Sequence, residues 1–478
     1  MNKLLFFVFL TIGYTACNNS KGNYSKAGDK PEYLLKGTIS NMPQAFIILA
    51  CIHDYEPEII DTIKIDKLGA FNYKFTNKSH TGIYRLMLGK DVKAQFFGGG
   101  ETYLDLIFNK EDIEFSTDFI AVEEKINFTK SEENKVYFEF LKHDDKTNTQ
   151  LEILSQMKEY FPEGDDFYPD IKKRYNTIQG NYFKYSDKLL SDYKDLFVSR
   201  IIKSKRYPKL DFGLTFVDKS KYMKLHYFDN VDFNDTLLMY TDVFSSKAFG
   251  YLQLYRNQQL PKDKQEKEFM KAIDFLFGRA NVNEKVYKYV RNYIIKGFER
   301  IDSEPILTYI AENYTLKNTC ESDKEAIKLN RRVEGFKKLS LGSKAPPLTI
   351  NDLNGKKVAL YDLQSEYSLV LFYASWCPHC SEMMPQLKTL YDKTDRSKIE
   401  IIAISIDSEK KSWQDFIEKG KYTWINSCDL KIWDGKAAAD FYVYATPTML
   451  LLDKNKNILA KPTSFEELKE ALKKTGIN

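Results

Sequence analysis

The tetrapeptide Cys377-Pro-His-Cys380 restricts the fold of this chain more than any other feature, because it joins two stretches of different pattern. The preceding run, 368–376, is rich in apolar, β-branched and aromatic residues and predicts a buried strand. The following stretch, 381–391, has helical spacing. The free N–H groups and partial positive charge of a helix N-terminus favour a thiolate over a thiol. The junction therefore predicts a dithiol that exchanges disulfides.

Length and charge limit the class of protein. A chain of 478 residues is long enough for about two to four domains. It is 43% hydrophobic and 29% charged, which is typical of packed globular domains. The 71 basic and 67 acidic residues leave a net charge of only +4. The lysines are interleaved with acidic residues and predict a solvated surface, so no nucleic-acid partner is expected.

The first residues have the pattern of a targeting segment. Lys3 precedes the apolar run 4–13, which is too short to span a membrane. A small residue then precedes Cys17, an arrangement that resembles a bacterial lipoprotein signal, although Tyr14 replaces the usual aliphatic residue. We expect a signal peptide at 1–16, lipidation of Cys17 and a flexible tether at 17–31. The alternative is an ordinary cleaved signal in which Cys17 is incidental.

Export places the chain in an oxidising compartment, where a Cys-x-x-Cys pair is more often redox-active than metal-binding. Of the six cysteines, Cys51 lies in an apolar run and is expected in a core. Cys320 and Cys428 have no predicted role. A structural zinc site needs four ligands, and the histidines outside the tetrapeptide are scattered. We expect neither a metal nor a cofactor.

Residues 32–120 predict a small β domain. Short runs such as Ala70–Phe75 alternate apolar and polar residues, and turn residues separate them at regular spacing. That arrangement favours a small sandwich or barrel. From 121 to 341 the apolar period changes to that of helices, with breaks at Pro162, Pro208 and Pro261, which predicts a helical domain.

Residues 342–478 predict a third domain of the α/β class. Apolar runs at 368–373, 399–406 and 448–452 alternate with stretches of helical spacing. Strands that alternate with helices indicate a layered α/β sheet. The predicted fold class is therefore multidomain α+β, with a β domain, a helical domain and an α/β domain in that order.

Four features of 342–478 resemble one known family. They are the entry segment 342–356, the active-site run 373–380, Pro385 within the next helix, and the segment 445–453. Together and in this order they resemble the TlpA/ResA-like thioredoxin-fold thiol–disulfide oxidoreductases, which are membrane-attached. The strand order of 32–120 resembles the small β domain in front of thioredoxin domains in lipoproteins of the Bacteroidetes type.

The position of each cysteine predicts its role. Cys377, near the helix N-cap, is expected to be an exposed nucleophile with a lowered pKa. Cys380, one turn later, is expected to be a less exposed resolving thiol. Pro378 suits the first helical turn, where its missing N–H would be unpaired in any case. When protonated, His379 would favour the reduced form and a more oxidising potential, although it could also be a solvent-facing spectator.

Further residues are expected to support the pair. Trp376 would shield the disulfide, or it is only a packing residue. The resemblance implies a cis peptide bond before Pro447, and the backbone of Thr446 would then pair with an extended substrate segment.

The chain departs from related patterns at two positions. Thioredoxins have a buried Asp where this chain has Leu371, and several relatives have Glu where it has Met383. Glu382 is one residue early and should point elsewhere, since a helix turns about 100° per residue. The sequence therefore does not identify the group that relays the proton of the resolving thiol. A peroxidase of the peroxiredoxin type is disfavoured, because Ala374 replaces its Thr.

The resemblance implies an envelope thiol–disulfide oxidoreductase, lipid-anchored and periplasm-facing, that reduces protein disulfides. Its partners would be protein thiol or disulfide substrates and an upstream redox partner. Two alternatives stay open. One is a dithiol oxidase of the DsbA kind, favoured by Pro-His between the cysteines. The other is an envelope lipoprotein that binds a ligand or partner, with an ancillary thioredoxin domain.

Overall fold

The computed structural model describes residues 33–53, 56–76, 78–89, 101–301, 303–315 and 323–477. The chain divides into two compact units, Met1–Gly297 and Phe298–Asn478. The expected signal peptide, Cys17, the tether and Cys320 lie outside the described residues. Among the helices of the described ranges, none combines the length and apolarity that a membrane crossing requires.

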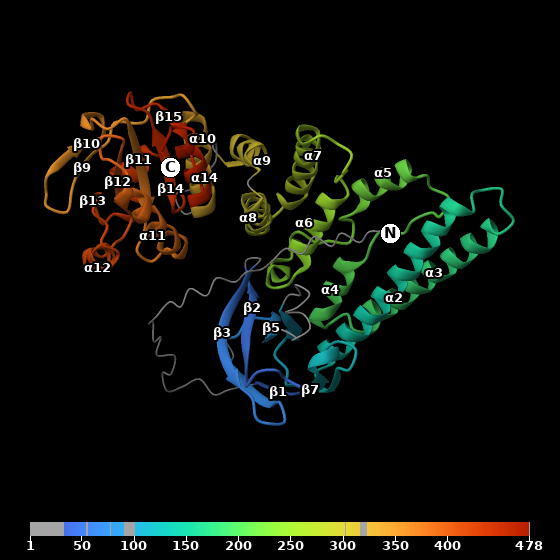
Figure 1. The fold of residues 1–478 in the computed structure, drawn as a ribbon. Coiled ribbons are helices and arrows are strands. Elements are labelled where there is room, and N and C mark those ends of the chain that lie inside the picture. The colour runs from blue at the N-terminus through green and yellow to red at the C-terminus, as the bar shows by residue number, and fades with distance from the viewer. Residues whose placement is uncertain are drawn as a thin grey trace. The chain divides into compact units, whose positions relative to one another are not determined.

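The first unit begins with a β-sandwich, blue to teal in Figure 1. Its sheets have the strand orders β4-β1-β7-β8 and β3-β2-β5-β6. The apolar alternation of β1 turns Leu35 and Ile39 into a core shared by both sheets, and Lys36 outward. The strands are β1 (Tyr33–Ser40), β2 (Phe46–His53), β3 (Glu56–Lys64), β4 (Ala70–Phe75), β5 (Gly82–Gly89), β6 (Thr102–Phe108), β7 (Ile113–Asp118) and β8 (Asn127–Lys130).

Helices follow the sandwich, as the change of period predicts. Ser131 caps the first of them by accepting a hydrogen bond from the N–H of Asn134. The breaks at Pro162, Pro208 and Pro261 fall between helices, which confirms them. The helices are α2 (Glu132–Tyr160), α3 (Tyr168–Asp192), α4 (Phe197–Lys205), α5 (Phe216–His226), α6 (Val243–Gln253), α7 (Lys262–Ala280) and α8 (Glu284–Arg300), with short helical turns η1 (Phe119–Ala121) and η2 (Thr236–Tyr240).

The second unit contains a thioredoxin-like α/β domain, orange to red in Figure 1. Its five-stranded sheet has the order β13-β12-β11-β14-β15, with β11 parallel to β12 and antiparallel to β14. The central strand β11 is almost wholly buried, as its apolar run predicts. The strands are β9 (Thr349–Asn351), β10 (Lys357–Ala359), β11 (Tyr367–Tyr373), β12 (Ile399–Ser405), β13 (Ile425–Cys428), β14 (Thr448–Leu452) and β15 (Ile458–Ala460). The helical elements are α9 (Glu304–Ile310), η3 (Ala311–Thr315), α10 (Lys324–Lys338), η4 (Leu360–Asp362), α11 (Pro378–Lys393), α12 (Lys410–Gly420), η5 (Ile432–Asp434), α13 (Lys436–Asp440) and α14 (Phe465–Lys473).

Two expected boundaries differ from the structure. The β domain was expected to end at residue 120, but β8 extends it because this strand pairs with β7. The α/β domain was expected to begin at 342, whereas the second compact unit begins at Phe298. The reason is that α10 packs on the α/β domain, where Arg331 Nη1 donates a hydrogen bond to the Trp433 carbonyl oxygen at 2.8 Å.

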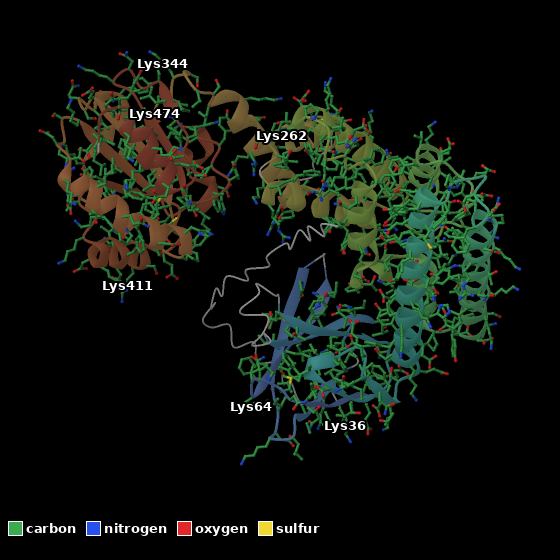
Figure 2. All side chains as sticks on the ribbon, turned by 45° about the vertical axis from the view of Figure 1, so that its right-hand side comes forward. Lys36, Lys64, Lys262, Lys344, Lys411 and Lys474 are labelled. Carbon is green, nitrogen blue, oxygen red and sulfur yellow. The ribbon has the colours of Figure 1, made fainter. Side chains whose placement is uncertain are left out.

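Lysines in both units lie at the surface. Six of them are labelled in Figure 2, and all six are exposed: Lys36, Lys64, Lys262, Lys344, Lys411 and Lys474. These six agree with the expectation that the interleaved charges form a solvated surface, whereas Lys247 and Lys456 are buried.

Candidate active site

Cys377 occupies the N-cap of α11, directly after the loop that leaves β11. Its backbone is extended, with φ −83° and ψ 117°, and Pro378 opens the helix. The sulfur accepts a hydrogen bond from the N–H of Cys380 at 3.3 Å. The sequence thus places a sulfur where unpaired N–H groups and the helix dipole both stabilise negative charge.

The two sulfurs differ little in exposure. The Cys377 side chain is 4% exposed and that of Cys380 is 0% exposed. The expectation of an exposed Cys377 is therefore wrong, although Cys380 is the more buried of the two. Cys377 is buried because its sulfur packs against main-chain atoms, while Pro378 and His379 beside it are exposed. Trp376 is also 56% exposed, so most of its ring is open to solvent.

The loop before β14 contacts the first cysteine. The Thr446–Pro447 peptide bond is cis, as the resemblance implies. In its protonated form the Cys377 thiol donates a hydrogen bond to the Thr446 carbonyl oxygen at 3.4 Å. The Thr446 backbone, which the resemblance expects to pair with substrate, is thus next to the nucleophile. In this dithiol structure its carbonyl oxygen accepts the hydrogen bond of the Cys377 thiol.

The two cysteines titrate in opposite directions. The hydrogen bond from the Cys380 thiol lowers the pKa of Cys377 to about 5, although burial opposes it. Three further groups lower the pKa of Cys377: the Thr446 side chain, the Cys380 N–H and the charge of His379. For Cys380, the hydrogen bond to Cys377 and burial raise the pKa. At neutral pH the pair therefore holds a thiolate at Cys377 and a proton at Cys380, which is the arrangement that disulfide exchange requires.

A buried carboxylate that sequence reasoning missed holds the loop before Cys377. Asp407 is 1% exposed. Its Oδ2 accepts a hydrogen bond from the Ser375 N–H at 3.0 Å, and its Oδ1 accepts one from the Ser375 hydroxyl at 2.7 Å. The Ser405 hydroxyl donates to Oδ2 at 2.5 Å. A signal existed, because Asp407 follows an apolar strand whose C-terminal end lies beside that of β11.

Both departures from related patterns are filled by buried apolar side chains. Leu371 is 0% exposed and Met383 is 5% exposed, so apolar side chains fill both positions. Glu382 is exposed, which confirms that it points elsewhere. Within the described residues, no group of three or more His, Cys, Asp or Glu side chains could hold a metal ion.

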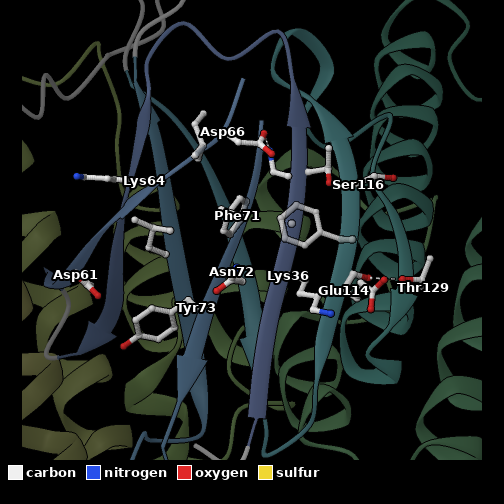
Figure 3. Close-up of a pocket in the computed structure, with 16 residues that line it drawn as sticks. Lys36, Asp61, Lys64, Asp66, Phe71, Asn72, Tyr73, Glu114, Ser116 and Thr129 are labelled. Carbon is white, nitrogen blue, oxygen red and sulfur yellow. Dashed lines mark hydrogen bonds between the residues drawn. The ribbon is translucent and has the colours of Figure 1, made fainter. Parts of the chain in front are cut away.

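Two pockets lie in the first unit, whereas Cys377 and Cys380 belong to the second unit. One, of about 840 Å³, lies on the β-sandwich and is shown in Figure 3. Lys36, Asn72 and Glu114 line it from neighbouring strands, and Asp66 lies at its other end. The other, of about 730 Å³, lies along α2 and α3. Neither is lined by a cysteine, so the redox chemistry belongs to Cys377 and Cys380.

Comparisons with known proteins match the same part of the chain. The AhpC/TSA family matches residues 341–461. The thiol–disulfide oxidoreductase ResA of Bacillus cereus is 30% identical over 135 residues, which cover 28% of this chain and 76% of that protein.

Two solved structures also match. The thioredoxin domain of a thiol–disulfide oxidoreductase from Bacteroides vulgatus is 28% identical and covers 29% of this chain and 99% of that domain, with a TM-score of 0.27. A domain of a possible thiol-disulfide isomerase from Cytophaga hutchinsonii is 34% identical and covers 29% of this chain and 94% of that domain, with a TM-score of 0.27. With the match to ResA and a Cys-x-x-Cys pair at the N-terminus of α11, the chain belongs to the ResA-like thiol–disulfide oxidoreductases of the thioredoxin fold.

Proposed function

We propose that this chain reduces protein disulfides in the bacterial cell envelope, using Cys377 as nucleophile and Cys380 as resolving thiol. The observation that carries the proposal is the place of the Cys377 sulfur at the N-cap of α11, where it accepts the Cys380 N–H at 3.3 Å. The lowered pKa of Cys377 and the raised pKa of Cys380 agree with that geometry. A thiolate attacks disulfides, and a thiol does not. A second thiol one turn later can release the product without an outside reagent.

The reaction balances over two exchanges. The Cys377 thiolate attacks one sulfur of the substrate disulfide, and the other sulfur leaves and takes up a proton. Cys380 then loses its proton and attacks the Cys377 sulfur, which releases the second substrate sulfur. The substrate gains two electrons, and the enzyme keeps a Cys377–Cys380 disulfide. An upstream dithiol partner must return two electrons before the next cycle.

The support sites have separate tasks in this proposal. Thr446 and Pro447 would hold an extended substrate segment beside Cys377, because the Cys377 thiolate, unlike the thiol, does not donate to the Thr446 carbonyl. Trp376 would cover the mixed disulfide, since its exposed ring can reach a bound substrate. Pro378 and His379 would shape the exposed surface next to the sulfur.

Location at the envelope is supported by the N-terminal sequence alone. Lys3, the apolar run 4–13 and Cys17 fit a lipoprotein signal. Lipidation of Cys17 would anchor the chain to a membrane and leave its domains facing the periplasm. Mass spectrometry of the mature N-terminus checks this, because an unmodified residue there would exclude the anchor.

A second candidate, a dithiol oxidase, has a specific observation in its favour. A lowered nucleophile pKa stabilises the reduced form and makes the pair more oxidising. The reference nucleophile pKa values are about 7 for thioredoxin and about 3.5 for DsbA. The value of about 5 for Cys377 lies between them. The reduction potential of this pair is therefore expected between those of the two references, about −270 and −120 mV.

The reduction potential of the Cys377–Cys380 pair decides between the two directions. We expect a value clearly below about −120 mV when the full chain is equilibrated with glutathione buffers and the thiols are counted by mass. At that potential the enzyme can reduce strained or exposed disulfides, whereas structural disulfides below about −300 mV resist it. A measured value near −120 mV would exclude efficient reduction and favour the oxidase.

A further inference from the structure

Helix α10 lies against the segment that leads into the loop beside Cys377. Arg331 Nη1 donates hydrogen bonds to the carbonyl oxygens of Trp433 at 2.8 Å and of Val443 at 3.5 Å. Further along the helix, Lys338 Nζ donates to the Tyr442 hydroxyl at 2.7 Å. The helix therefore binds this segment through both main-chain and side-chain atoms.

Helix α9 fixes a second arginine of α10 over the same segment. The Arg332 guanidinium lies 5.0 Å from the centre of the Tyr444 ring. Its Nε and Nη2 donate to Glu304 Oε2 at 3.0 and 2.8 Å. The Arg332 side chain is only 7% exposed, so this pair is shielded from water. A charge-assisted contact in a shielded place holds both helices and the tyrosine in one arrangement.

A glycine allows the close approach between helix and segment. A Cβ added at Gly335 would lie 2.7 Å from the Tyr442 Cβ, which is closer than two carbon atoms can pack. Tyr442 itself has φ +51°, in the left-handed region that non-glycine residues rarely adopt. The contact with α10 thus falls on a strained residue that needs outside support.

The supported segment continues directly into the active site. Tyr444 precedes Thr446 by two residues, and the Thr446 carbonyl oxygen lies 3.4 Å from the Cys377 sulfur. We propose that α9 and α10 form a clamp that positions the loop 442–447 against Cys377. Arg331, Arg332 and Gly335 are then positioning residues for the exchange with a polypeptide substrate. The inference rests on the proposed function in one respect: a substrate segment pairs with Thr446.

The test compares two glycine-to-alanine substitutions in the full chain. Gly335→Ala forces α10 and Tyr442 apart, because its Cβ has no room. Gly297→Ala, in α8, is the matched control, since a Cβ there meets nothing within 4 Å. We expect Gly335→Ala to lower kcat/KM for insulin disulfides by about 10-fold, mainly through KM, because a misplaced binding group weakens substrate positioning. Alkylation of Cys377 by iodoacetamide does not require a substrate segment to pair with Thr446, so its rate at pH 7 should change far less than kcat/KM for insulin. The control should match wild type in both assays.

A second pair of variants covers the case in which Gly335→Ala does not fold. Arg331→Met removes the contacts with Trp433 and Val443, and Lys328→Met removes a cation of the same helix that pairs with Glu299 instead. Only Arg331→Met should raise KM for insulin. Equal defects in the two variants, or an equal loss of insulin reduction and alkylation in Arg331→Met, would overturn the clamp as a positioning device.

The outcomes separate this inference from the proposed function. If wild type reduces insulin and both clamp variants match it, the clamp is wrong and the reductase stands. If wild type does not reduce insulin but oxidises a reduced, unfolded protein, the reductase is wrong. The clamp is then judged by the same KM comparison in the oxidising direction.

Discussion

Replacing Cys377 with serine is expected to slow the reduction of insulin disulfides by at least about 10³-fold. The serine hydroxyl does not ionise at neutral pH, so no attacking anion forms. Serine is also a good N-cap, and its oxygen can accept the Cys380 N–H that the sulfur accepts now. The variant should therefore fold and lose only the chemistry. Insulin turbidity with dithiothreitol as the reductant, corrected for the reaction without enzyme, measures the rate.

The matched control is Cys51→Ser, which removes a free, half-buried thiol from β2 in the first unit. It should keep the wild-type rate. If Cys377→Ser retained more than about a tenth of wild-type activity, another group would have to be the nucleophile, and the assignment of the site would fail.

Replacing Cys380 with alanine is expected to stop turnover after the first exchange. The Cys377–substrate disulfide would form and persist, because the only described thiol that hydrogen-bonds to the Cys377 sulfur would be gone. Loss of that thiol also removes the largest cause of the lowered pKa of Cys377, so the pKa should rise from about 5. A non-reducing gel should show a covalent complex with insulin chains, and multiple-turnover rates should fall about 10³-fold.

One control variant and one contradicting outcome complete this test. The double substitution Cys377→Ser with Cys380→Ala should give no complex, since it lacks the attacking sulfur. Cys380→Ala with wild-type turnover and no trapped complex would show that release does not depend on an internal thiol, which contradicts the proposed two-step exchange.

The fold and the redox pair could be predicted because they depend on patterns among neighbouring residues. The alternation of β1, the helical period of α2 and the apolar run of β11 each act over neighbouring residues. The junction between β11 and α11 places Cys377 at a helix N-cap without any distant contact. Local periodicity determines such elements, and a dithiol at such a junction has a defined chemistry.

What the sequence could not predict depends on residues far apart in the chain. Cys377 is buried partly by Thr446, 69 residues away. Asp407 reaches Ser375 across 32 residues, and its place follows from the register of β11 and β12. The contact from Arg331 to Trp433 spans 102 residues and moves α10 into the second unit. Contacts between distant residues leave no periodic signal in the sequence. The domain boundary predicted at residue 342 therefore excluded α10 from the unit on which it packs.

The central claim is that Cys377 is a thiolate at neutral pH and that a small reagent reaches it despite its 4% exposure. The pH dependence of its alkylation tests that claim directly. The reduced full chain would be treated with iodoacetamide from pH 4 to 9, and the rate at Cys377 followed by mass spectrometry of its peptide. The thiolate fraction rises as pH passes upward through the pKa. A rate with a midpoint near 5 and a plateau through pH 7 is therefore the predicted result. A midpoint near about 8.5, the value of an ordinary cysteine, would contradict the account, as would a rate no faster than that of Cys51.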